Sequence, residues 1–259
     1  MGGFSFASVI LSYFLISGGT FLTTLLAARL GLANEYLGYA IMAVGAFLGG
    51  FIAARASHGS TIIEPAIGAV VMIASIVGLG LAVSSSESRG VILLPANMKG
   101  IGLTAAASAG GGIAGAFLSE KLLGKSTTSS APWLLYVAVA GFGAGVMGSI
   151  FGGVIGKGEG GPLLGMVAVC CLLVGGAAGA SARTRPLLAS LFGGALGVFA
   201  FFYLAVVIFV NLFPGARGAA EEGIPGEVYA GLAIMAGGAG LATMIGALIG
   251  WATVGKKNQ

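Results

Sequence analysis

Three side chains in one stretch of the chain are the best candidates for ion or proton chemistry: Arg55, His58 and Glu64. Glu64 stands within an apolar run and is followed directly by Pro65. A carboxylate at membrane depth is costly unless it is paired or protonated, and proline removes a backbone donor beside it. Together these residues predict a proton- or cation-responsive site in which Glu64 is the titrating group.

The same residues have a simpler structural interpretation. Glu64 and Pro65 both suit the first turn of a helix, where acidic side chains are favoured and a missing N–H is tolerated. Glu64 would then lie in the headgroup zone, neutralised by Arg55. His58 is the only histidine, and without other strong metal ligands nearby it is expected to be a solvated loop residue. We favour this structural interpretation, and the functional hypothesis stays open beside it.

Patterns for catalysis, metals and cofactors are missing from the sequence. It has no GxSxG, HExxH or GxxxxGK[ST] motif and no aspartate. Its two cysteines, Cys170 and Cys171, are adjacent in an apolar run, where we expect packing rather than a disulfide. The basic residues are scattered and form no stripe, which argues against a nucleic-acid partner. We therefore expect no enzymatic activity, no cofactor and no metal.

Composition places the chain in a membrane. Hydrophobic residues make up 57% of it and charged residues only 8%, whereas soluble domains carry about 25% charged residues. With so few charges, most of the surface must face lipid. The sequence predicts an all-α polytopic transmembrane bundle whose main partner is the lipid bilayer.

About eight apolar runs have the length that a helix needs to cross a bilayer, roughly 17 to 25 residues. The fourth is the weakest, being short and rich in Gly, Ala and Ser. The predicted spans are 6–28, 36–54, 62–83, 101–118, 133–155, 162–182, 187–212 and 228–254.

The distribution of Lys and Arg predicts the orientation. With eight spans both termini share one side, and that side carries the larger share of the 12 basic residues. Because cytoplasmic loops are enriched in Lys and Arg, both termini are predicted to be cytoplasmic. We expect a multi-pass protein of a bacterial inner (plasma) membrane.

A shift of the sequence by 126 residues aligns the first three spans with spans five to seven without a gap. Gly49-Gly50 then falls on Gly175-Gly176, and Gly68 falls on Gly194. The shift predicts two four-helix units, residues 1–125 and 126–259, in one bundle. Since four is even, both units would run in the same direction, as a parallel repeat.

The predicted unit, with "GGFIAARASHGS" at the end of its second helix, resembles small uncharacterised Gly-rich four-helix bacterial membrane proteins. The resemblance implies a tandem fusion of two such units over nearly the whole chain. It implies no biochemical role and carries over no functional residues.

Glycine, at 49 residues, is the most unusual feature of the composition. In lipid, helices associate through close backbone approach at small residues. We therefore predict tight helix packing, although glycines can also serve a pore or a sliding interface. The glycines expected at helix contacts are Gly49, Gly50, Gly141, Gly145, Gly148, Gly152, Gly175 and Gly176.

Two classes of function remain after these exclusions. A transport or channel-like role for a small solute or ion is favoured by the duplication, the Gly/Pro-interrupted helices and the membrane-embedded Glu64. A non-catalytic structural or accessory subunit is favoured by the scarcity of polar groups and by helix faces that can pack a partner. Homo-oligomers and other membrane subunits are the expected protein partners.

Overall fold

The computed structural model is an all-α bundle. The structure describes residues 4–30, 35–56, 62–84, 98–123, 133–156, 160–181, 187–212 and 226–254, which hold eight helices and no strand. The helices are α1 (Phe6–Arg29), α2 (Glu35–Ala56), α3 (Ile63–Ser84), α4 (Met98–Leu123), α5 (Trp133–Ile155), α6 (Gly160–Ser181), α7 (Leu187–Leu212) and α9 (Gly226–Thr253).

The predicted polytopic bundle is confirmed, and most span limits agree within two residues. Six helices are long and apolar enough to cross a membrane: α1, α2, α5, α6, α7 and α9. The apolar part of α3 that can be described is shorter, Ile63–Gly78. The predicted limits of the fourth span were wrong, because α4 has 26 residues. Its ends carry Lys99, Glu120 and Lys121, and hydropathy alone cuts a helix short at such charges.

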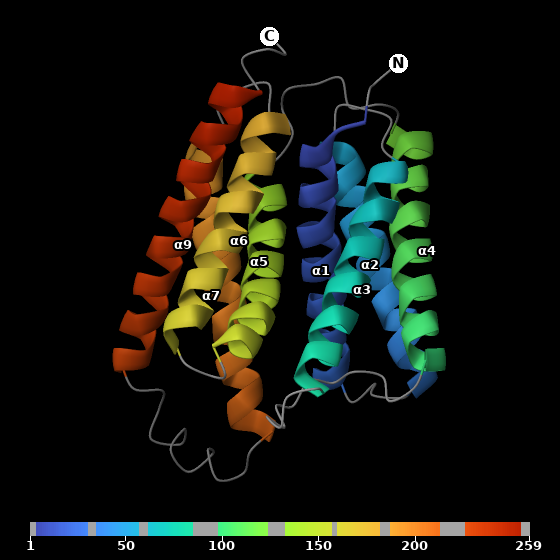
Figure 1. The fold of residues 1–259 in the computed structure, drawn as a ribbon, viewed down its shortest axis with the longest axis horizontal. Coiled ribbons are helices and arrows are strands. Elements are labelled where there is room, and N and C mark those ends of the chain that lie inside the picture. Colours follow the sequence, from blue (N-terminus) through green and yellow to red (C-terminus); the bar gives the residue numbers. More distant parts are fainter. Residues whose placement is uncertain are drawn as a thin grey trace.

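The helices pack as two groups of four that meet along α1 and α5. In the first group α1 contacts α2 and α3, and both of these contact α4; in the second, α5 contacts α6 and α7, and both contact α9. Figure 1 shows α1 and α5 side by side in the middle of the bundle. We call this junction the seam, and the end at which α1 begins and α9 ends the upper end (Figure 1).

Glycine allows the closest helix approaches in both groups. In α4, Gly111 and Gly115 lie against the carbonyls of Ala43 and Phe47 in α2. In α9, Gly246 and Gly250 lie against α6 carbonyls in the same way, those of Leu172 and Gly176. At each position a Cβ would overlap the facing oxygen, so the backbones touch without intervening side chains.

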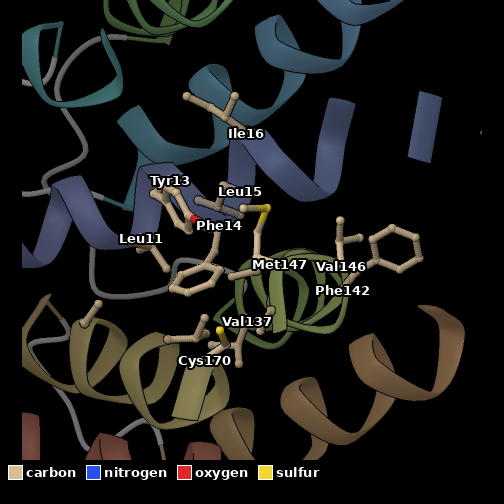
Figure 2. Close-up of a cluster of buried hydrophobic side chains, with 14 of the residues drawn as sticks. Leu11, Tyr13, Phe14, Leu15, Ile16, Val137, Phe142, Val146, Met147 and Cys170 are labelled. Atoms are coloured by element: carbon tan, nitrogen blue, oxygen red, sulfur yellow. The ribbon is translucent and has the colours of Figure 1, made fainter. Parts of the chain in front are cut away.

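The buried apolar core is continuous across the seam. It joins Leu15 and Ile16 of α1 to Val137 and Met147 of α5 and Val174 of α6. Figure 2 shows Phe14 projecting from α1 toward Cys170 of α6 and Met147 of α5. The two groups therefore form one packed body around α1 and α5.

Candidate functional site

Glu64 lies in the first turn of α3 with its side chain buried, 1% exposed. Its Oε1 accepts a hydrogen bond of 2.9 Å from the backbone N–H of Ser5, the residue that precedes α1. The carboxylate thus faces the N-terminus of α1, where free peptide N–H groups and the helix dipole favour negative charge. This contact ties the start of α3 to the start of α1.

Ser5 also takes part in a hydrogen bond through its side chain. Its Oγ accepts a long hydrogen bond, 3.4 Å, from the N–H of Ser8. Ser5 is therefore the N-cap of α1, and Ser8 occupies the third helical position. In a capping box the N-cap N–H is satisfied by a Glu at that third position. Here the third position holds Ser8, and Glu64 supplies a carboxylate from a different helix.

Arg55 lies in the last turn of α2, also at the upper end. Its side chain hydrogen-bonds Tyr136 in the first turn of α5, so this contact crosses the seam. Tyr136 in turn packs edge-on against Trp133, with ring centroids 5.9 Å apart. Sequence reasoning missed Tyr136, because nothing in the pattern of residues pairs α2 with α5. His58, the third predicted candidate, lies outside the described residues.

The eight glycines predicted at helix contacts all lie against a neighbouring helix. A Cβ on Gly49 would lie 2.6 Å from the Ile16 Cα, one on Gly148 2.6 Å from the Val167 Cα, and one on Gly145 2.8 Å from the Phe201 ring. The remaining contacts are Gly50 on Gly112, Gly141 on Gly194, Gly152 on Leu163, Gly175 on Thr243, and Gly176 more loosely on Gly246 at 3.8 Å.

At the seam, α1 and α5 cross through a reciprocal glycine pair. A Cβ on Gly18 would lie 2.5 Å from the Val139 carbonyl oxygen, and a Cβ on Gly143 would overlap the Phe14 carbonyl oxygen. Each glycine also faces the other's backbone nitrogen, at 3.1 and 3.0 Å from the added Cβ. The two helices therefore meet backbone to backbone at this point.

Corresponding glycine contacts also occur within the two groups, between α3 and α1 in the first and between α7 and α5 in the second. A Cβ on Gly68 of α3 would lie 2.9 Å from both the Ser12 Cβ and the Tyr13 nitrogen of α1. A Cβ on Gly193 of α7 would lie 2.9 Å from the Val137 Cβ and 3.1 Å from the Ala138 nitrogen of α5. The partners correspond at a shift of 125 residues, one fewer than the sequence suggested.

A groove of about 290 Å³ lies on one side of the seam. Its floor is made by the buried side chains of Tyr13, Phe14 and Cys170. Its walls come from α1, α3, α5 and α6, so both groups of helices contribute. The described residues that line it are Val9, Ile10, Tyr13, Phe14, Val71, Ser75, Phe151, Met166, Val169, Cys170 and Leu173.

Two hydroxyl groups are the main polar features of this seam groove. Ser75 Oγ donates to the Val71 carbonyl at 2.7 Å, and Ser75 is also the hydrogen-bond partner of the Tyr13 hydroxyl. Both hydroxyl groups thus have partners inside the protein. None of the described lining residues is charged, and such a lining suits an apolar ligand and provides no side chain that would coordinate an ion.

The part of the chain that the structure describes contains no group of three His, Cys, Asp or Glu side chains placed to hold a metal ion. Cys170 and Cys171 are buried free thiols there. Comparison with protein-family models, curated proteins and solved structures finds no match for this chain.

Proposed function

We propose that this integral membrane protein is a transport protein, channel-like or carrier-like, for a small solute. The observation that carries the proposal is the seam groove, which lies where the two groups of helices meet. In transporters built from two repeats, substrate sites lie near the bilayer midplane at the interface between the repeats. The groove has the corresponding location and a volume near the lower end of ligand pockets, about 300 Å³.

We also infer that the two groups of helices are duplicated units, 1–125 and 126–259. The support is that the helices of both groups pack in the same order. In addition, Gly143 corresponds to Gly18 and Gly193 to Gly68 at a shift of 125 residues, and the residues that these glycines contact correspond at the same shift. Both units begin with a helix that runs down from the upper end (Figure 1), as a parallel repeat requires.

In this proposal Glu64 acts where α3 and α1 begin, in the first unit. Its hydrogen bond to Ser5 holds α3 against α1, and α1 and α3 form one wall of the groove. Glu64 is therefore the residue of this proposal for which we keep a proton- or cation-responsive role, because its contact with Ser5 joins two of the helices that line the groove.

We place the protein in a bacterial inner membrane with both termini cytoplasmic and assign it no catalytic role. The orientation rests on the distribution of Lys and Arg. The non-catalytic assignment rests on the absence of any recognisable nucleophile–base pattern in the sequence.

A flux assay on purified protein in liposomes tests the transport proposal. Dithionite quenching reports the transfer of a fluorescent single-chain lipid between the leaflets, stopped-flow light scattering after an osmotic step reports small neutral solutes such as glycerol, and an entrapped pH dye reports protons. We expect protein-dependent flux of at least one of these probes, faster than through protein-free liposomes. Equal rates for every probe, with and without protein, would contradict the proposal.

A second function, as an accessory subunit, is supported by unpacked glycine faces. Gly231, Gly237 and Gly238 in α9, and Gly102 and Gly110 in α4, have no atom within 4 Å of an added Cβ. Small residues of this kind let a partner helix approach closely. Stable co-purification of another membrane subunit from the native membrane, together with no flux, would favour this second function.

A further inference from the structure

We propose that the seam groove binds one hydrocarbon chain of an amphiphile, which enters sideways from the bilayer. This proposal rests on the proposed transport function in one respect, because it names an amphiphile as the class of solute that is transported. Chain binding can be measured without any flux, so the two can fail separately. The occupant follows from the lining, the mouth, the size and the depth of the groove.

The lining excludes ions and strongly polar solutes. Of its residues, only Tyr13, Ser75 and the thiol of Cys170 carry polar side-chain groups, and none is charged. The two hydroxyl groups already have hydrogen-bond partners, Tyr13 with Ser75 and Ser75 with the Val71 carbonyl. Transferring a polar group into such a site without partners costs about 1–3 kcal/mol or more. The matching occupant is a hydrocarbon.

The mouth of the groove opens where the helices face lipid. Val71, Val169 and Leu173 line it and are 43–46% exposed, and Val70 beside them is 57% exposed. Lipid chains are the medium that surrounds such apolar side chains in a membrane. A chain can therefore reach the floor without crossing water.

The depth and size favour a single chain. The α3 and α6 lining residues lie 6 to 13 residues from the start of their helices, or roughly 10–20 Å at 1.5 Å per residue. Val9 lies near the start of α1 and Phe151 near the end of α5, so the groove also extends toward both ends of a hydrocarbon core about 30 Å thick. A volume of about 290 Å³ is at the lower limit of ligand pockets, about 300 Å³. It suits one slender chain better than a ring system or a two-chain lipid.

An amphiphile is the class of solute that connects binding of a hydrocarbon chain with the proposed transport. Apolar molecules dissolve in the bilayer and gain little from a carrier, because the tails of the lipids are as apolar as the groove. An amphiphile differs, since its polar head pays a large cost in hydrocarbon. A groove that holds the chain within the hydrocarbon core fits a protein that binds amphiphiles.

Photolabelling in liposomes tests the inference. The probe is palmitic acid with a diazirine in its chain, and labelled residues are mapped by mass spectrometry. We expect saturable labelling at the groove that unlabelled palmitate suppresses. Val71→Phe, which puts a ring into the groove, should reduce groove labelling about tenfold, whereas Val70→Phe, one residue away and outside the lining, should leave it unchanged.

Val169→Phe fills the opposite wall and serves as a second variant if Val71→Phe does not yield folded protein. Labelling that rises linearly with probe, resists competition and follows lipid exposure on all helices would overturn the inference. So would equal groove labelling of the wild type and both filled variants. Saturable labelling without flux would leave chain binding standing and remove only the transport proposal.

Discussion

Gly18 and Gly143 occupy reciprocal positions where α1 crosses α5. A Cβ on Gly18 would meet the carbonyl oxygen of Val139, and a Cβ on Gly143 would meet that of Phe14. Gly143 is numbered 125 above Gly18, and Val139 is numbered 125 above Phe14. The two helices therefore contact each other through corresponding positions. Side chains larger than hydrogen have no room at this crossing.

The seam should therefore be sensitive to a single methyl group. Gly143→Ala would force α1 and α5 apart or strain their backbones, and overpacking of this kind costs about 1–3 kcal/mol. Thermal unfolding in detergent should show a lower Tm for this variant. Gly153→Ala is the matched control in the same helix, because no atom lies within 4 Å of its added Cβ. A Tm for Gly143→Ala equal to that of the control would disprove the tight crossing.

The pairing of α6 with α9 gives a second glycine test. Gly250→Ala should lower the Tm, because its Cβ would overlap the Gly176 carbonyl, again at about 1–3 kcal/mol. Gly238→Ala adds the same methyl to the same helix in open space. It should be neutral or slightly stabilising, because Ala is the better helix former by up to about 1 kcal/mol. The opposite ranking of the two Tm values would count against this packing.

Glu64 should contribute to stability through the Ser5 N–H. Glu64→Ala removes this acceptor from the half-buried Ser5 N–H, at a cost of about 1 kcal/mol, and should lower the Tm. Glu64→Gln keeps an acceptor oxygen and should lose less. Glu120→Gln, in the last turn of α4, controls for removal of a glutamate charge. If Glu64→Ala melts with the wild type, the bond to Ser5 has no energetic role.

Single cysteines test how the helices cross the bilayer. Phe4, Leu122 and Val254 lie at the upper end of the bundle, whereas Leu30 and Ile155 lie at the opposite end, and all are exposed. In sealed vesicles a membrane-impermeant maleimide should label Cys variants of the first three from one side and of the last two from the other. The native Cys170 and Cys171 are buried and should react little. Labelling of Leu122→Cys and Val254→Cys from opposite sides would break the eight-helix topology.

The sequence was sufficient for the helices because each is a continuous apolar run with polar ends. The limits of α5 and α7 are the predicted ones. Those of α4 were too narrow, because Lys99, Glu120 and Lys121 lie within the helix near its ends. Hydropathy ends a predicted span at such charged residues.

The contacts between helices were harder to predict from the sequence than the helices themselves. Gly143 was not among the predicted packing glycines, although it lies at the seam. Periodicity shows which residues share a helix face but not which helix covers that face. For the same reason the sequence singled out Glu64 without its partner Ser5, and gave no sign of a groove assembled from four helices.

The most direct test of the account is the flux of whichever probe the protein passes, measured in Val71→Phe and Val70→Phe side by side. Both variants add a ring to α3 at neighbouring exposed positions, and only Val71 lines the groove. The account predicts a flux about tenfold slower, or about 1.4 kcal/mol, for Val71→Phe and wild-type flux for Val70→Phe. Equal flux through the two variants would contradict the claim that the seam groove is the functional site.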